Sequence, residues 1–480
     1  MNITSPDDIE YNVEQAIEHI GFGRFQIQLL LICGLFAATD AMEMLLLAVL
    51  SPVLRCEFKL SQVEVACITT VVFVGMFSGS FIWGHVSDKY GRLITMFLAS
   101  IWIFYFGICV AFSPSYYWVL FLRGSVGFAF GGAIQAFTLI SEYLPMKYRA
   151  KVLIIYCVLG TCGSIFELGI SALIIPRYGW RVLVAVSALP TCISTLCIWT
   201  LPESARYLVT IGKHNQAYNV LNYIAQKNGK TLPSRRLIST MKLEKPNVFV
   251  IFSRKFLRLN IQLWICWLYV AFSHYGLILS QSEILEFSHH LKDDVSEMTA
   301  KAVCNCNLFK TSDYVSMILS TLGEFLVIPF NLCLVDSIGR KYTIMLNFII
   351  SSICFFLIIV SKSKIMLTLV CFANRAIIST IFNCIYIYTV ESQTIVGYLF
   401  KSVKKSLKDI YPTTIRSSAL GICSSMARIG AIITPFVAQV LLNYSLTAAM
   451  VLYGSLSLVC AVNSLLLKSE TSGQGLRQDI

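Results

Sequence analysis

A short polar segment, GHVSDKYGR at residues 84–92, separates two long apolar runs and sets the architecture of the chain. A second version, DSIGRK at residues 336–341, lies between two further apolar runs about half a chain later. Both contain the pattern Asp-x-x-Gly-Arg. Asp and Gly are ordinary turn residues, so a single copy would mean little. Two copies in equivalent gaps indicate a duplicated membrane unit.

The composition is that of a membrane protein. Of the 480 residues, 56% are hydrophobic and 13% are charged, and the mean hydropathy is +0.71, whereas a soluble chain has about 25% charged residues. Repeated apolar runs of about 18 residues or more indicate a polytopic helical membrane protein and exclude a soluble one. The net charge of +12 does not indicate nucleic-acid binding, because Lys and Arg gather in alternate loops, as expected of cytoplasmic loops.

The apolar runs predict an all-α membrane protein with twelve transmembrane helices in two six-helix pseudo-repeats. The expected spans are residues 25–47, 63–83, 93–112, 117–140, 152–175 and 182–201, then 259–279, 314–335, 342–360, 365–390, 417–442 and 446–467. An even number of spans places both termini on one side, and the Lys and Arg of the loops on that side indicate the cytosol.

These spans divide the chain into five segments. They are a cytoplasmic N-terminus at 1–24, a six-helix bundle at 25–201, a cytoplasmic central linker at 202–258, a second six-helix bundle at 259–467 and a cytoplasmic C-terminus at 468–480. Within the linker, Ala217, Val220, Leu221 and Ile224 recur at helical spacing. This spacing predicts a surface helix.

The second half departs from the first after its tenth span. In the first half, EYLPMKYR at residues 142–149 has the pattern Glu-x-x-Pro-x-x-x-Arg. In the second half Glu391 begins the same pattern, but Pro412 and Arg416 come too late. Removing residues 392–409 restores the pattern, so this basic segment is interpreted as an insertion. It is a membrane-surface helix, a tolerated loop insertion, or sequence retained from an intron.

Several motifs resemble the major facilitator superfamily. The repeated six-span half with its Asp-containing loop is typical of it, and LPESAR at residues 201–206 looks like the Pro-Glu-Ser-Pro/Ala-Arg motif of sugar and organic-ion transporters. Four runs resemble the synaptic vesicle 2-related group, relatives of the organic cation and anion transporters. They are GFGRFQ (21–26), TDAMEM (39–44), VFVGM (72–76) and SMARIGAIITPF (425–436). One departure is Val390, where the family usually has Pro.

The resemblance implies a secondary active transporter. Such a carrier moves a small organic solute by rocking its two halves about a site near the membrane midplane. The expected setting is a monomer surrounded by membrane lipid in a cytoplasmic vesicle membrane. The alternative is a vesicle membrane protein that keeps the carrier fold but acts as a binding or scaffold protein, since fold alone does not prove transport.

In the family, charged loop residues form gates that hold the carrier closed on the cytosolic side. An Asp can interact with an adjacent helix N-terminus, and an Arg can bind a carboxylate through two hydrogen bonds. The alternative is that they are turn and anchor residues. The predicted gating residues are Asp88, Arg92, Glu142 and Arg149, with Asp336, Arg340, Glu391 and Arg416 in the second half.

The predicted substrate-binding residues are Arg428, Glu324 and Glu167, each near the middle of a span. Charges at this depth are costly, so each needs a partner or a function. Arg is permanently charged, and Arg428 would attract a carboxylate or another anion. The resembling anion carriers have Arg at this place and the cation carriers have Asp, which favours an organic anion. The alternative is that Arg428 and Glu324 pair with each other.

Asp40 and Glu43 are the predicted coupling site, because they lie three residues apart on one face of the first span. Two neighbouring carboxylates repel, which favours uptake of a proton or another coupling ion. The alternative is a surface pair at the end of the span. Arg123 and Arg375, in spans four and ten, hold matching places and are expected to pair with carboxylates of neighbouring helices.

The chain shows no sequence pattern for a metal, a cofactor or an enzyme. Most of the 17 cysteines lie in apolar runs, where Cys acts as a small hydrophobic residue. Cys56, Cys304 and Cys306 fall in predicted lumenal loops, so a disulfide among them is open. There is no Ser/His/Asp set or phosphate-binding loop, and the Gly-rich run at residues 124–132 is explained better by close helix packing.

Overall fold

The computed structural model describes residues 11–232, 254–293, 309–326, 338–361, 363–403 and 412–467. These ranges are almost entirely helical, which confirms the all-α class. An α-helix satisfies every backbone polar group within its own segment, so it is the form that an apolar chain takes in lipid.

The chain forms two compact units. Unit 1 comprises Met1–Met44, Val74–Ile170 and Arg177–Leu243, and unit 2 comprises Leu45–Phe73, Ser171–Pro176 and Glu244–Ile480. The elements up to the central linker are α1 (Val13–Ile20), α2 (Arg24–Phe58), α3 (Gln62–Tyr90), α4 (Arg92–Ala111), α5 (Tyr116–Phe130), α6 (Ile134–Glu142), α7 (Met146–Ser187), α8 (Leu189–Ile198), α9 (Ala205–Thr210) and α10 (His214–Lys227). Those that follow are α11 (Arg254–Asp293), α12 (Thr311–Thr321), the 3-10 helix η3 (Leu322–Leu326), α14 (Arg340–Val360), α15 (Lys364–Val403), α16 (Pro412–Pro435), the π-helix η4 (Phe436–Leu441), α17 (Leu442–Tyr444) and α18 (Leu446–Leu465).

Within the described ranges, 10 helices are long and apolar enough to cross a membrane. Two features account for the difference from the twelve expected spans. The fifth and sixth spans form one continuous stretch, Met146–Ile198, which is kinked at Gly179, where φ is 79°. The eighth span, expected at 314–335, begins in α12 and η3 and then leaves the described residues after Leu326.

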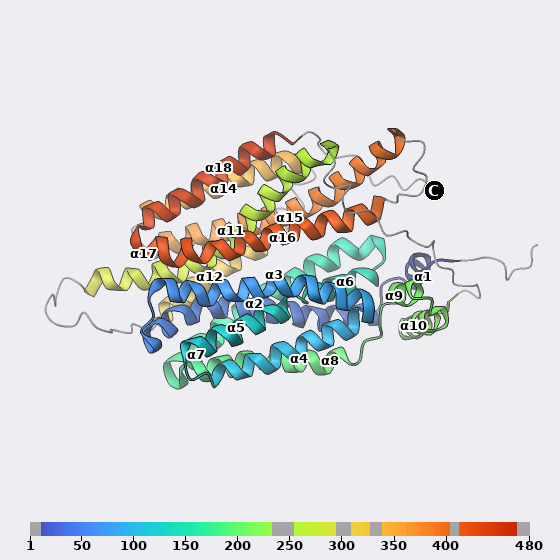
Figure 1. Cartoon of the computed structure of the whole chain (residues 1–480), viewed down its shortest axis with the longest axis horizontal. Helices are drawn as coiled ribbons and strands as arrows, with labels where there is room; N and C mark the ends of the chain where they lie inside the picture. Colours follow the sequence, from blue (N-terminus) through green and yellow to red (C-terminus); the bar gives the residue numbers. More distant parts are fainter. Residues whose placement is uncertain are drawn as a thin grey trace, which may run out of the picture. The chain divides into compact units, whose positions relative to one another are not determined.

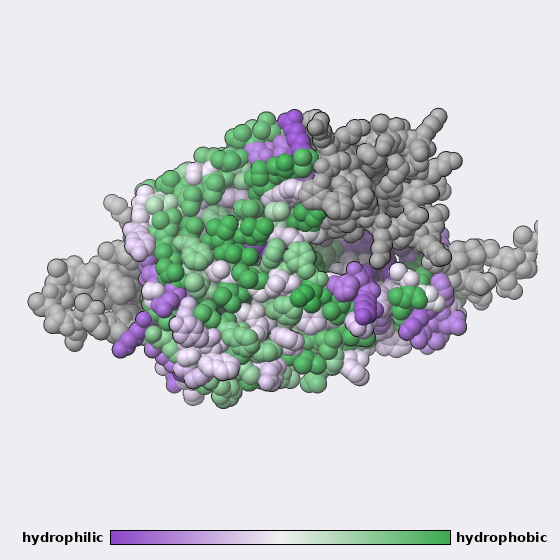
Figure 2. Space-filling model, viewed as in Figure 1, coloured by the Kyte–Doolittle hydropathy of each residue, from purple (hydrophilic) through white to green (hydrophobic). Residues whose placement is uncertain are grey.

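The surface of the long helices is apolar. Large hydrophobic side chains such as Phe121, Leu196 and Trp199 are exposed in unit 1, as are Val360 and Leu369 in unit 2. On the face shown in Figure 2, hydrophobic residues cover the middle of the long helices, and hydrophilic residues gather near their ends. This pattern is expected when lipid, rather than water, surrounds the helices.

The Gly-rich run at residues 124–132 packs α5 against α3, as predicted. A Cβ at Gly79 would lie 2.0 Å from the Phe128 carbonyl oxygen, and one at Gly131 would lie 2.5 Å from backbone atoms of α3. The Trp83 indole donates to the same Phe128 oxygen at 3.0 Å. Small residues therefore bring the two backbones together, as in many membrane helix pairs.

Each unit has its own helix pairs. In unit 1, α4 packs against α5 and α8, and in unit 2, α11 packs against α16 and α14 against α18 (Figure 1). The short helices α1, α9 and α10 gather beyond one end of the long helices of unit 1 (Figure 1). The predicted linker helix is confirmed by α10, which buries Ala217, Leu221 and Ile224.

Candidate functional site

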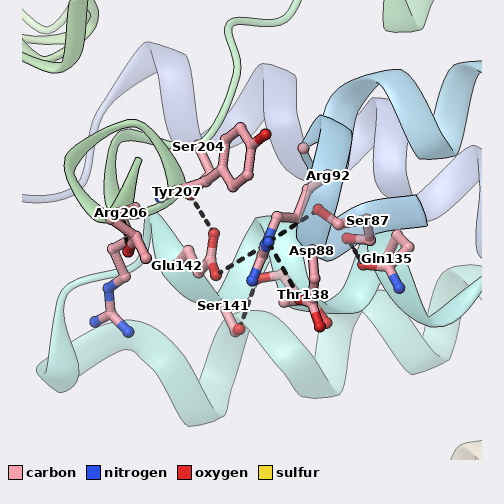
Figure 3. A network of polar contacts seen from close by, with 12 residues as sticks. Ser87, Asp88, Arg92, Gln135, Thr138, Ser141, Glu142, Ser204, Arg206 and Tyr207 are labelled. Atoms are coloured by element: carbon pink, nitrogen blue, oxygen red, sulfur yellow. Dashed lines mark hydrogen bonds and ion pairs between the residues drawn. The ribbon is translucent and has the colours of Figure 1, made fainter. Parts of the chain in front are cut away.

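The first charged centre surrounds the start of α4. Arg92 begins this helix directly after Gly91, whose φ is 104°. The Arg92 guanidinium lies 3.7 Å from Asp88 and 3.6 Å from Glu142, and it donates to the Ser87 carbonyl oxygen at 3.1 Å (Figure 3). Three of the predicted gating residues therefore meet, and Arg92 stands between the other two.

Glu203 supports this centre from the segment before α9. Its carboxylate accepts hydrogen bonds from the backbone N–H groups of Arg92, at 3.0 Å, and of Leu93, at 3.2 Å. A negative charge is stabilised at a helix N-terminus, where the first N–H groups lack a helical partner. A Cβ at Gly91 would lie 2.2 Å from this carboxylate, so the Glu203 side chain would have to shift, and the φ of 104° itself favours glycine.

Hydroxyl groups complete the network. Ser204 donates to Glu142, and Tyr207 donates to the Lys89 carbonyl oxygen at 2.7 Å. The Tyr143 hydroxyl donates to the Glu203 carbonyl oxygen at 2.6 Å and accepts from the Ala205 N–H at 2.9 Å. Burial raises the pKa of the Tyr143 phenol above its usual range, so this hydroxyl stays protonated and remains a donor at physiological pH.

Arg149, the fourth predicted gating residue of the first half, lies in α7 and donates to the Leu144 carbonyl oxygen at 3.3 Å. It therefore holds the turn between α6 and α7. We call the set formed by Asp88, Arg92, Glu142, Glu203 and Ser204 the Asp88 network.

The second copy of the loop repeats the local geometry. Arg340 begins α14 after Gly339, whose φ is 93°. Thr343 donates to the Gly339 carbonyl oxygen at 2.6 Å, just as Thr95 donates to the Gly91 oxygen at 2.7 Å. The duplication that the sequence indicates is thus visible in the backbone.

The structure describes no side-chain contacts for the other three predicted gating residues of the second half. Asp336 lies outside the described residues, and Glu391 and Arg416 lie on α15 and α16 at positions whose side chains are not described. Of the predicted insertion 392–409, the part up to Val403 belongs to α15, and the rest lies outside the described residues.

A second charged centre lies within the spans of unit 1. Arg123 of α5 forms an ion pair with Glu43 of α2, and its side chain is 1% exposed. Glu167 of α7 is fully buried and accepts a hydrogen bond from Ser187 at 2.8 Å. Arg123 and Glu43 both interact electrostatically with Glu167. One guanidinium therefore lies within electrostatic range of two buried carboxylates and forms its ion pair with Glu43.

Hydrogen-bonding capacity remains in this centre. Among the described residues, Arg123 Nε and Nη2 and Glu167 Oε2 are buried without a hydrogen-bond partner. Asp40 lies one turn before Glu43 and is half-buried. The two residues of the predicted coupling pair lie in the same helix, α2, and the ionic partner of Glu43 is Arg123.

A third charged centre lies within the spans of unit 2. Arg375 of α15 lies 3.3 Å from the Glu324 carboxylate and donates to the Thr321 hydroxyl at 2.8 Å. His274 of α11 interacts electrostatically with both Glu324 and Arg375. The expectation that Arg123 and Arg375 pair with carboxylates of neighbouring helices is confirmed in both units.

Arg428 differs from these two arginines. It is half-buried in α16, and no residue in the described part of unit 2 forms an ion pair with it. The alternative in which Arg428 pairs with Glu324 is not what the structure contains, because Glu324 is bound by Arg375.

Two remaining expectations concern metals and cysteines. The described residues hold no group of three or more potential metal ligands. Cys56 is disulfide-bonded, whereas Cys304 and Cys306 lie outside the described residues.

Sequence reasoning missed several members of these centres. Glu203 and Ser204 lie in the LPESAR motif, which served only as a mark of resemblance although it supplies the carboxylate at the start of α4. Ser187 and Thr321 carry no signal of their own, because a hydroxyl in an apolar run is indistinguishable from an ordinary helix residue. Tyr143 lies in the EYLPMKYR motif, but the pattern Glu-x-x-Pro-x-x-x-Arg does not include it. The LPESAR motif could have revealed Glu203 and Ser204, but only the fold reveals the other three.

Comparison with known proteins gives consistent results. The model of the Major Facilitator Superfamily matches residues 30–394 and 314–478. The chain is 39% identical to the synaptic vesicle 2-related protein of Bos taurus, over 99% of this chain and 84% of the relative, and it has the same identity and coverage with the Xenopus laevis protein. The crystal structure of a D-xylose-proton symporter matches 93% of this chain and 99% of its own, with a TM-score of 0.67 at 14% identity.

The matched segments cover nearly all of both halves, and the fold of the superfamily comprises twelve helices in two halves. The expected architecture is therefore confirmed, as is the resemblance seen in the motifs. The chain belongs to the major facilitator superfamily and is a multi-pass membrane transporter of that type.

Proposed function

We propose that this transporter carries a small organic anion by alternating access and couples the movement to a proton. The proposal is carried by the difference in charge balance between the charged centres of the two units. Unit 1 gathers two carboxylates around one arginine, whereas unit 2 contains, in Arg428, an arginine without an ionic partner in the described part of the chain.

The permanent charge of Arg428 supports an anion as the solute. A guanidinium within a span is costly unless it is paired or faces water. Glu324, the nearest candidate from the sequence, is bound by Arg375. We therefore assign the role of principal substrate ligand to Arg428, which would bind a carboxylate or a similar anion through two hydrogen bonds. Glu324 would then act through Arg375 rather than by contacting the solute.

The charges of Glu43, Arg123 and Glu167 support a proton as the coupling ion. One guanidinium balances one carboxylate, so the second carboxylate is stabilised in its neutral form when both lie in a dry interior. Glu167 accepts from Ser187 through one oxygen, and its other oxygen has no partner in the described part of unit 1. We assign the exchangeable proton to Glu167 and Glu43. Asp40, one turn before Glu43, is the residue through which the proton would reach them.

The Asp88 network is assigned to the cytosolic gate. Its members are bound to one another through charged hydrogen bonds between α3, α4, α6 and the segment before α9, and they can hold one end of unit 1 in a single arrangement. We place this end, with both termini, in the cytosol because of the loop charges. The name shared by the relatives supports a vesicle membrane.

Solute flux in proteoliposomes tests this proposal. A panel of radiolabelled organic anions and cations is offered with and without an inwardly directed proton gradient, using the wild type, Arg428→Gln and the charge-conserving control Arg428→Lys. We expect gradient-driven uptake of at least one anion, lost in Arg428→Gln and partly kept in Arg428→Lys. Uptake of cations alone would overturn the choice of solute, and absence of flux over the whole panel would favour a binding or scaffold role.

A further inference from the structure

A fourth polar network joins α2 and α3 to α11 within unit 2. Arg55 of α2 donates to the Gln62 side chain at the start of α3, at 2.7 Å, and lies 3.5 Å from the Glu283 carboxylate of α11. The Glu283 side chain is only 1% exposed, while that of Arg55 is 17% exposed. A nearly dry carboxylate is therefore held by an arginine that reaches it from another helix.

The network continues from Glu283 into the helix that carries Arg428. Asn443 donates to the Glu283 carboxylate at 3.1 Å and, through the same nitrogen, to the Gln439 carbonyl oxygen at 2.7 Å. The Gln439 side chain then donates to the Ser51 hydroxyl at 2.8 Å and accepts from the Thr69 hydroxyl at 3.3 Å. Five helical segments are thus connected by side chains, and we call these seven residues the Arg55 network.

The backbone of the Arg55 network has an unusual form. Gln439 lies in the π-helix η4, which interrupts the regular helix between α16 and α17. π-helical turns disturb the usual hydrogen-bond ladder and occur often at functional sites. Here the carbonyl oxygen of Gln439 accepts from the Asn443 side chain, and the side chain of Gln439 is fully buried.

The position of the network follows from α3. Gln62 begins this helix and Tyr90 ends it, so the Arg55 network and the Asp88 loop lie at opposite ends of the same helix. Ser51, Arg55, Gln62 and Thr69 belong to the first half of the duplicated sequence, whereas Glu283, Gln439 and Asn443 belong to the second half. In a carrier that rocks its two halves, contacts of this kind at one end must form and break in each cycle.

We propose that the Arg55 network is a latch that closes the transporter at the end opposite the Asp88 loop and opens once in each transport cycle. The inference rests on the proposed alternating access but not on the identity of the solute. Glu283 favours the closed state, in which its buried carboxylate is paired with Arg55. Removing the arginine from a buried carboxylate strongly destabilises the arrangement that buries it. Gln439 and Asn443 transmit the closure to the helix that carries Arg428.

Thiol accessibility in the full-length protein tests the latch without any solute. Thr69→Cys places a reporter in the buried contact with Gln439, and a membrane-impermeant maleimide is applied to nanodiscs, with site-specific labelling measured by mass spectrometry. We expect slow labelling while the other six members of the latch are unchanged. Glu283→Gln and Arg55→Gln, each in this background, should raise the labelling rate at least about tenfold, because each removes one charge of the ion pair that joins α2 to α11. The exchange variant, Arg55→Glu with Glu283→Arg, should restore slow labelling.

Two controls make the outcome decisive. Glu57→Gln removes an exposed carboxylate two residues from Arg55 and should leave the rate unchanged. The buried Cys460 of α18 reports loss of folding, so a parallel rise in its labelling would overturn the latch. Unchanged rates in both single variants would overturn it as well. Because no solute is present, absence of anion flux would count against the proposed substrate and not against the latch.

Discussion

Arg123 and Arg375 hold matching places in the two halves of the chain, yet their surroundings differ. Arg123 forms an ion pair with Glu43 and is influenced by a second buried carboxylate, Glu167. Arg375 binds Glu324 and a neutral threonine hydroxyl, with His274 within electrostatic range. The first centre therefore contains an excess of acid, whereas the second is balanced.

The difference indicates how a duplicated unit has diverged. A buried centre with one carboxylate too many favours binding of a proton, so it suits ion coupling. A balanced centre suits a structural role, and Arg428, which has no ion pair with the described residues, is then the arginine that we propose as the anion ligand. We infer that coupling and solute recognition have been divided between the two units.

The largest expected effect comes from removing Arg123. Arg123→Leu would leave Glu43 and Glu167 buried without a counter-charge, which should lower stability by about 3–5 kcal/mol and abolish transport. Thermal unfolding of the purified protein in detergent measures the loss. The double variant Arg123→Leu with Glu43→Gln should recover most of the stability but not the transport.

The same substitution at the other arginine sharpens the comparison. Arg375→Leu leaves one half-buried carboxylate, Glu324, rather than two buried ones, so it should destabilise the protein less than Arg123→Leu does. An equal or larger loss of stability for Arg375→Leu would contradict the proposed excess of acid around Arg123.

The next effect concerns Arg428. Arg428→Gln should reduce anion uptake at least about tenfold, as expected when one member of a charged contact is lost. The unfolding temperature should hardly change, because Arg428 has no ion pair with the described residues to lose. A large loss of stability would instead show that Arg428 is a structural residue.

A smaller effect is expected at Glu167. Glu167→Gln keeps the hydrogen bond to Ser187 but cannot release a proton, so uptake driven by a proton gradient should fall about fivefold or more, in line with usual coupling energies. Exchange of internal for external solute needs no net proton movement and should persist. If exchange and gradient-driven uptake fall equally, Glu167 serves the solute or the fold rather than coupling.

The smallest effect is expected at Asp88. Its side chain is 79% exposed and lies 3.7 Å from Arg92, so Asp88→Asn should change the gate equilibrium by less than about 1 kcal/mol. Glu142→Gln, whose carboxylate is 12% exposed, should shift it more. Cysteine accessibility at the gate in both variants provides the measurement, and a larger shift for Asp88→Asn would reverse the assigned order.

The sequence predicts the fold well because apolar length and loop charge report directly on membrane spans. The repeated Asp-x-x-Gly-Arg loop also predicts the duplication, which the starts of α4 and α14 confirm. Pairing is harder to predict. The partner of Glu43 is Arg123 of α5, and the partner of Glu324 is Arg375, because helix packing rather than spacing along the chain decides which charges meet.

The partners of uncharged polar groups are harder still to predict from the sequence. Ser187 and Thr321 bind Glu167 and Arg375, but in the sequence they are small polar residues in apolar runs. The Arg55 network was also invisible, because its members are spread over the chain from Ser51 to Asn443 and meet only after folding.

The division of roles between the two units is tested most directly by one transport measurement. Proteoliposomes containing wild type, Arg428→Gln or Glu167→Gln are given an organic anion, with and without a proton gradient. We expect gradient-driven uptake in the wild type, loss of at least about nine-tenths of both uptake and exchange in Arg428→Gln, and preserved exchange with gradient-driven uptake lowered about fivefold or more in Glu167→Gln. If both variants lose binding and exchange together, or if both keep gradient-driven uptake, coupling and recognition are not divided as proposed.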